Sequence, residues 1–157
     1  MSTQNIILPS QVADFIISFA NDVWETLTHL KLQKLVYYSQ AWFLANNNIP
    51  LFQEDFQAWV HWPVLRSLYE ECNRSYPNSQ IIKTIDKKTL ANIPKKISDF
   101  LKELCETYMP YGWYELELMT HNELPWQEAR GELDDRINSE NIISKETMRV
   151  FYKSLIA

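Results

Sequence analysis

The sequence predicts a mainly α-helical fold with a minor β element, arranged as a single compact domain around one central, buried helix. Three observations support this prediction. Apolar residues recur at spacings of three, four and seven along much of the chain, residues 28–45 are apolar on nearly every side, and only two short stretches resemble strands. The length of 157 residues suits one domain with a normal core, so we expect residues 1–157 to form it.

The first helix is expected after Pro9, ends near Asp22 and precedes the central helix at about residues 28–45. Two narrow polar stripes interrupt the apolar surface of the central helix: Lys31 with Lys34, and Gln33 with Gln40. A helix that is apolar nearly all round is either the centre of a domain or half of an interface. The two lysines are the residues least explained by packing, because a charge in such a helix needs a partner or an exit to water.

The predicted β element begins at residues 56–61, which alternate with period two. We expect this strand to pair with a second short strand at residues 81–85. Pro63 ends the first strand and suits the first turn of a following helix, where its missing N–H has no effect. That helix directs apolar residues between positions 64 and 72 inward.

The second half of the chain adds three predicted helices. The most clearly amphipathic one follows Pro94 and extends to about Tyr108, and a short helix is expected over residues 114–119. The last helix is capped by Ser144. Its expected buried residues are Met148, Phe151, Tyr152 and Leu155.

Composition excludes several classes of function. The two glycines, Gly112 and Gly131, cannot form a glycine-rich phosphate loop, and a net charge of −5 disfavours nucleic acid as a partner. Cys72 and Cys105 have no metal-ligand spacing and indicate buried thiols in a reducing compartment. We find no signal-like or membrane-spanning stretch, so we expect a cytoplasmic protein with no membrane partner.

Two further features favour a protein partner. Aromatic residues make up 13% of the chain, with six Trp and eight Tyr, and such residues concentrate at interfaces. Acidic residues dominate between Tyr111 and Arg136. If this segment is functional, it favours a basic partner and speeds the encounter with it.

The candidates for catalysis are few, because His29, His61 and His121 are the only histidines. His121 with Thr120 and Glu123 could supply an acid–base pair, but residues two apart on a helix point away from each other. A metal-dependent hydrolase would need His61 and His121 to converge with a carboxylate, and no HExxH or CxxC signature is present. We therefore expect no enzymatic activity, no metal and no cofactor.

Two blocks of sequence resemble one known family. The first comprises Leu30–Tyr38, Pro50–Phe52, Ala58–Trp59 and His61–Val64, and the second comprises Tyr111–Gly112, Glu115–Leu116 and Met119–Trp126. In this order and separation they resemble the Panacea domain, also called the SocA-like family, over residues 10–155. One departure is Trp62, which stands where the family usually has Gly before Pro-Val.

The resemblance implies a non-catalytic antitoxin of a type II toxin–antitoxin module, because members commonly neutralise protein toxins by direct contact. The expected partner is a cognate toxin encoded by an adjacent gene. The alternatives are a protease adaptor that delivers a toxin for degradation and a phage-encoded counter-defence protein. The candidate partner-binding residues are Lys31, Gln33, Lys34 and Tyr37 on the central helix, Trp59, His61 and Trp62 after it, and Thr120, His121, Glu123 and Trp126 in the second block.

Overall fold

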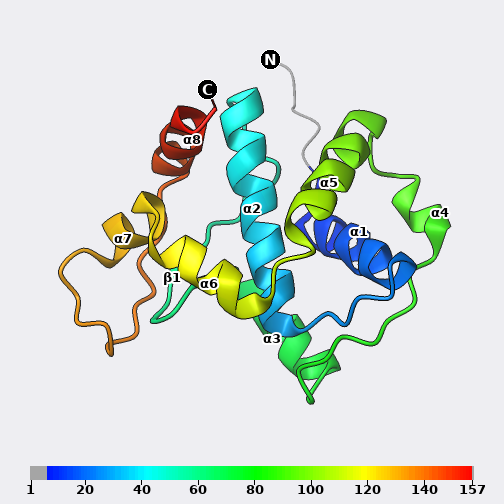
Figure 1. Cartoon of the computed structure of the whole chain (residues 1–157), viewed down its shortest axis with the longest axis horizontal. Helices are drawn as coiled ribbons and strands as arrows, with labels where there is room; N and C mark the ends of the chain where they lie inside the picture. Colours follow the sequence, from blue (N-terminus) through cyan, green and yellow to red (C-terminus); the bar gives the residue numbers. More distant parts are fainter. Residues whose placement is uncertain (1–6, 157) are drawn as a thin grey trace.

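A long central helix, α2 (His29–Asn47), organises the fold of this computed structural model, which describes residues 7–156 (Figure 1). The hydroxyl of Thr28 caps the helix by accepting a hydrogen bond from the Lys31 N–H at 3.2 Å. Asn48 ends it in the left-handed conformation with φ 60°, which Asn tolerates better than most residues. Fourteen of the nineteen residues of α2 are buried, so the helix is the centre of the structure, as the sequence predicts.

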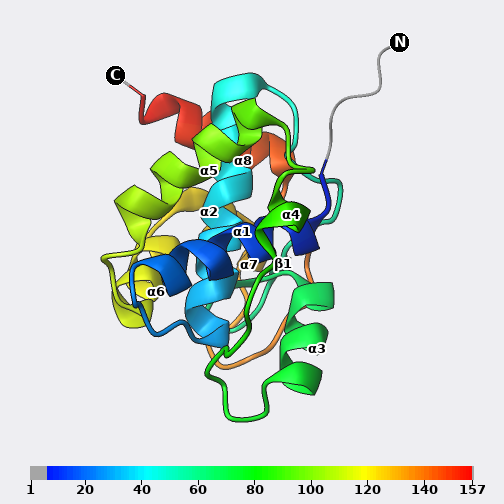
Figure 2. The same cartoon turned by 90° about the vertical axis from the view of Figure 1, so that its right-hand side faces the viewer.

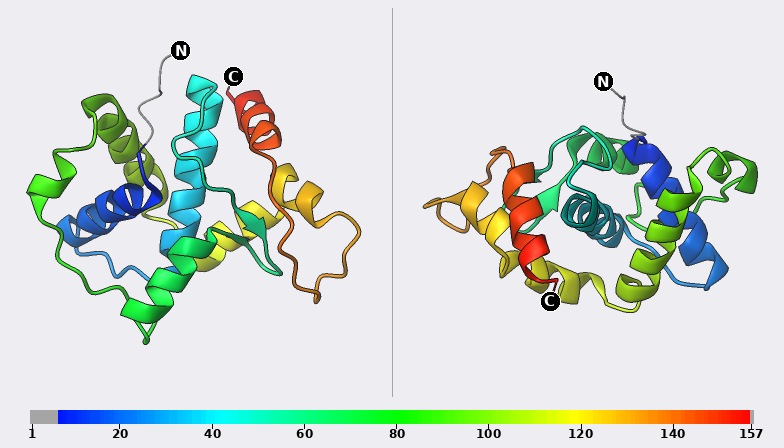
Figure 3. Two further views of the ribbon diagram at one scale, coloured as in Figure 1. Left: turned by 180° about the vertical axis from the view of Figure 1, so that it is seen from behind. Right: turned by 90° about the horizontal axis from the view of Figure 1, so that it is seen from above.

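The other helices surround α2 on both sides (Figures 1 and 3). On one side lie α1 (Pro9–Asp22), the short α4 (Lys87–Leu90) and α5 (Lys95–Tyr108). On the other side α8 (Lys145–Ser154) packs along α2. Figure 2 shows the same arrangement from the side, with α1 crossing in front of α2. The prediction of a mainly helical fold is confirmed.

The β element differs from the prediction. β1 (Gln57–Ala58) pairs antiparallel with β2 (Pro63–Val64), immediately beyond a tight turn, and not with residues 81–85. Residues 81–85 are extended, and the Ile81 N–H donates to the carbonyl of Leu27 at 2.8 Å. The placement of Pro63 in a helix was also wrong, because the helix that follows, α3 (Arg66–Ser75), begins three residues later.

Two helices follow α5 and lead towards α8. The predicted short helix is confirmed as α6 (Trp113–His121), and α7 (Leu124–Arg130) follows after one turn. The helix α7 is not among the helices predicted from the sequence. In α8 the Ser144 cap is confirmed by a 3.0 Å bond from the Thr147 N–H, but Leu155 lies beyond the helix and is exposed.

The polar stripes of α2 are buried because they bind backbone groups of the segments packed on the helix. The side-chain amide of Gln33 donates to the carbonyl of Leu65 and accepts from its N–H, both at 3.0 Å. Gln40 does the same between the Phe52 carbonyl and the Leu51 N–H, both at 2.7 Å. Each glutamine thus satisfies two buried backbone groups that lack a ladder partner. Within residues 7–156, no helix has the length and apolar character that crossing a membrane requires.

Candidate functional site

Two histidines from the signature blocks and one glutamate between them in the sequence meet beside the β1–β2 turn. His61 lies in that turn, and Glu117 and His121 lie four residues apart on α6, where this spacing places them on one face. The nearest ligand-type atoms of the three side chains all lie within 4.8 Å of one another. The two imidazole rings are nearly parallel, at 12°, with centroids 6.4 Å apart. The convergence of His61 and His121 that a metal-dependent hydrolase would need is therefore present.

A buried lysine lies behind this cluster. Lys34 is fully buried, and its ammonium has no hydrogen-bond partner among the described residues. Its Nζ lies 4.0 Å from a carboxylate oxygen of Glu117 and 4.4 Å from the ring centroid of Trp62, which is a cation–π distance. Burial lowers the pKa of Lys34 to about 8, and the nearby Glu117 carboxylate opposes that shift.

His121 is held by an aromatic surface. Its ring stacks on Trp126 with centroids 4.1 Å apart, and the Trp126 indole N–H donates to the carbonyl of Trp59 at 3.0 Å. Burial lowers the pKa of His121, which a backbone hydrogen bond with His61 opposes. The Nε2 atom of His121 is buried and has no hydrogen-bond partner in the part of the chain that the structure describes. The neutral imidazole is therefore favoured, and one of its nitrogens is free to bind something else.

The other two polar residues of the second block have different environments. Thr120 is buried, and its hydroxyl donates within the helix to the carbonyls of Leu116 and Glu117 at 3.3 and 3.0 Å. Glu123 points away from His121 into a cluster of tyrosines, where Tyr38 and Tyr152 both donate to it. Thr120, His121 and Glu123 thus do not form one acid–base unit.

The predicted binding residues on α2 are internal. Lys31 is buried and its ammonium donates to the carboxylate of Glu25 at 2.9 Å and to the carbonyl of Met109. Gln33 forms the backbone clamp described above, and Tyr37 is buried against Phe56 with ring centroids 5.2 Å apart. The expectation of accessible binding groups on this helix is corrected, because segments remote in sequence cover all four, Lys34 included.

The turn that carries His61 tolerates a tryptophan. Positive φ among the described non-glycine residues occurs at Trp24, Asn48 and Ser79, and not at Trp62. The backbone here does not need glycine, so the departure from the family pattern introduces no strain. Trp62 is half-buried over Lys34, and Trp59 is half-buried with its ring edge-on to Tyr69 at 4.8 Å.

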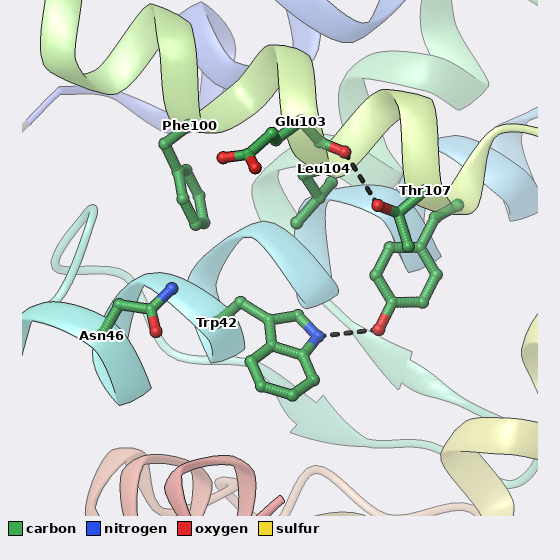
Figure 4. A pocket seen from close by; sticks show the side chains of 7 residues that line it. Trp42, Asn46, Phe100, Glu103, Leu104 and Thr107 are labelled. Carbon is green, nitrogen blue, oxygen red and sulfur yellow. Dashed lines mark hydrogen bonds between the residues drawn. The ribbon is translucent and has the colours of Figure 1, made fainter. Parts of the chain in front are cut away.

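A groove of about 250 Å³ between α2 and α5 is a weaker candidate (Figure 4). Several of its polar groups are already paired. The Trp42 indole N–H donates to the Tyr108 hydroxyl at 2.7 Å, and the Thr107 hydroxyl donates to the backbone carbonyl of Glu103 at 2.9 Å. Only the Asn46 amide and the Glu103 carboxylate, among the described residues that line the groove with polar side chains, would be left to orient a ligand.

The sequence reasoning missed the outer face of α6. Trp113, Tyr114 and Leu118 expose 44%, 56% and 45% of their surface, while Leu116 and Thr120 on the opposite face are buried. Tyr114 and Leu118 are four residues apart and so lie one above the other. We call Trp113, Tyr114 and Leu118 the α6 surface. The sequence signal for this surface was the four-residue spacing of Tyr114 and Leu118, on the side of the helix away from Leu116 and Thr120.

The chain belongs to the SocA-like antitoxin family. The family model described as antitoxin SocA-like, Panacea domain, matches residues 32–127, which include α2, the β1–β2 turn, α6 and the first part of α7. The resemblance stated from the two signature blocks is thereby confirmed. No curated protein and no solved structure matches the chain.

Proposed function

We propose that this protein is the antitoxin of a type II toxin–antitoxin module and that it neutralises a protein toxin by direct contact through the α6 surface. The observation that carries the proposal is the exposure of a tryptophan, a tyrosine and a leucine on one short helix. Aromatic anchors of this kind supply most of the binding energy in protein interfaces once a partner has buried them. Membership of an antitoxin family supports a toxin as the partner.

The charges around the α6 surface favour a basic toxin. Residues 111–136 contain seven acidic side chains and two arginines. Glu115, Glu128 and Glu132 in this segment are exposed, and Arg130 is buried against the Ala58 carbonyl and the Trp126 ring. An excess of exposed acidic groups in the segment that carries the apolar anchors attracts a positively charged partner and accelerates association.

The accessible residues predicted from sequence adjoin this surface. His61 is exposed, and His121 is partly exposed on the same helix as Tyr114 and Leu118. The buried members of the prediction, Lys34 among them, contribute by holding the turn and α6 together. The toxin covers the exposed face of α6 and the adjoining turn.

Co-expression with the product of the adjacent gene tests the proposal. Growth rescued by this protein, together with co-purification of the two proteins, is the expected result. Trp113→Ala and Tyr114→Ala should each weaken the complex by about tenfold or more, since an interface anchor contributes ~2 kcal/mol. Circular dichroism of the variants checks that the exposed substitutions leave the fold unchanged.

Trp24→Ala is the matched control. Trp24 lies in the α1–α2 loop and is 94% exposed, so the variant removes the same side chain from another surface. Full rescue by the Trp113 and Tyr114 variants would exclude the α6 surface, and loss of rescue in the Trp24 variant would place the interface at the α1–α2 loop. Rescue without a complex, accompanied by a shortened toxin lifetime, would favour the protease adaptor.

A further inference from the structure

The His61, Glu117 and His121 cluster has the composition of a transition-metal site. Two imidazoles and one carboxylate are a ligand set that Zn²⁺ takes when a fourth position stays open. Two of the ligands come from one helix at a spacing of four residues, and the third comes from the turn between two strands. These elements position the three side chains independently of any metal.

To bind one ion, the three ligand atoms need to move only slightly closer to one another. The ligand-type atoms lie within 4.8 Å of one another, whereas ligand atoms about 2.0–2.1 Å from a tetrahedral ion are separated by roughly 3.3 Å. Side-chain rotation at His61, Glu117 and His121 can supply this approach without moving the backbone of α6. The buried Nε2 of His121 has no hydrogen-bond partner within residues 7–156, which is a second indication, because a buried polar atom without a partner is uncommon.

We propose that His61, Glu117 and His121 bind one divalent ion of the Zn²⁺ type, with an open coordination position on the solvent side. The exposed His61 marks that side, and the stacked Trp126 ring holds the His121 ring in place. The bound ion links the β1–β2 turn to α6. It therefore fixes the turn next to the surface proposed to contact the toxin, although metal binding itself does not depend on that function.

The buried Lys34 ammonium sets a limit on affinity. It lies 4.0 Å from Glu117, so it competes with the ion for this carboxylate and repels a second positive charge. The consequence is specific to this site: replacing Lys34 by the uncharged Met should strengthen metal binding. A metal held by unrelated surface groups would not respond to a fully buried lysine.

Isothermal titration with Zn²⁺ and the visible spectrum of the Co²⁺ form test the site on the full chain, freed of any affinity tag. We expect one equivalent of Zn²⁺, a tetrahedral Co²⁺ spectrum and a higher melting temperature with metal. His61→Ala should abolish binding, Glu117→Gln should weaken it by tenfold or more, and Lys34→Met should strengthen it severalfold.

His29→Ala is the matched control, since it removes the remaining histidine of the chain and should leave the affinity unchanged. His61 is exposed in a turn, so its variant keeps the test valid even where His121→Ala fails to fold. Absence of Zn²⁺ and Co²⁺ binding by the unmodified protein would overturn the proposal. Binding that persists in His61→Ala, or that disappears in His29→Ala, would overturn it equally.

Discussion

Replacing Glu123 by Ala should destabilise the fold by removing an acceptor shared by two buried tyrosines. The Tyr38 and Tyr152 hydroxyls both donate to the same Glu123 carboxylate oxygen, at 2.9 and 2.7 Å. Both tyrosines are fully buried, on α2 and α8. The Tyr152 hydroxyl keeps the Tyr37 hydroxyl as a weaker acceptor at 3.3 Å, whereas no acceptor other than Glu123 is found for the Tyr38 hydroxyl within residues 7–156.

The magnitude follows from the desolvation of the two hydroxyls. Each buried donor left without an acceptor costs about 1–3 kcal/mol. Tyr152 retains Tyr37 as an acceptor and Glu123 is partly exposed, so water can reach the vacated position, and we expect a total of ~1–3 kcal/mol. For a protein of this size this lowers the melting temperature by roughly 2–12 °C.

The Glu123→Gln variant distinguishes the contribution of the two hydrogen bonds to stability from the contribution of the carboxylate charge. Burial raises the pKa of Glu123, which means that the structure disfavours the ionised form, while the two tyrosine bonds favour it. Gln keeps an oxygen that can accept both bonds and carries no charge, so its effect on the free energy of unfolding should stay within ~1 kcal/mol.

Urea and thermal unfolding, followed by circular dichroism, measure these effects. Glu128→Ala is the control on the same helix, because its exposed carboxylate accepts a bond from Thr147 at 2.7 Å and should change stability by no more than ~0.5 kcal/mol. An Ala variant as stable as the unmodified protein, or a Gln variant as unstable as the Ala variant, would refute this account.

Three other changes test the interior. Lys34→Met should leave the free energy of unfolding in urea unchanged or raise it by up to about 4 kcal/mol, because it removes a buried charge that has no hydrogen bond within the described part of the chain and only a distant carboxylate. A large loss of stability would show that the attraction of Lys34 to Glu117 and Trp62 exceeds the cost of burying its charge. Gln33→Leu should destabilise by ~1–3 kcal/mol, since the Leu65 N–H loses its acceptor while the Leu65 carbonyl keeps the Tyr69 N–H, and unchanged stability would contradict the clamp. Cys105 should resist thiol reagents in the folded protein and react on unfolding, because burial raises the pKa of its thiol to about 12; rapid reaction of the folded protein would contradict this.

Most helices were predicted well because the signals that mark a helix, the spacing of apolar residues and the capping residue, lie within its own sequence. The spacing of apolar residues placed α1, α2, α5, α6 and α8, and the Ser144 cap marked the start of the last helix. The pairing of β1 was missed because a strand pattern contains no information on its partner. The partner β2 contains Pro63, which the first-turn rule for helices had assigned to α3.

Only part of the candidate site could be predicted, because a local sequence pattern does not show which distant segments will meet. His61 and His121 were identified as candidates, yet their convergence depends on how the β1–β2 turn packs against α6. The polar stripes of α2 indicated that some partner was needed. They could not show that the partners are backbone groups of the same chain, as for Gln33, or an aromatic ring, as for Lys34.

Buried Lys34 connects three segments that are separate in the sequence. It lies on α2, its ammonium faces Trp62 in the β1–β2 turn, and it lies 4.0 Å from a carboxylate oxygen of Glu117 on α6. The central helix, the turn and α6 therefore meet in the interior around this side chain. The α6 surface itself faces solvent and contributes nothing to this framework. Stability and partner binding should consequently separate: if the α6 surface binds the proposed toxin, Trp113→Ala should weaken that complex and leave the free energy of unfolding unchanged, whereas Lys34→Met should leave the α6 surface itself intact.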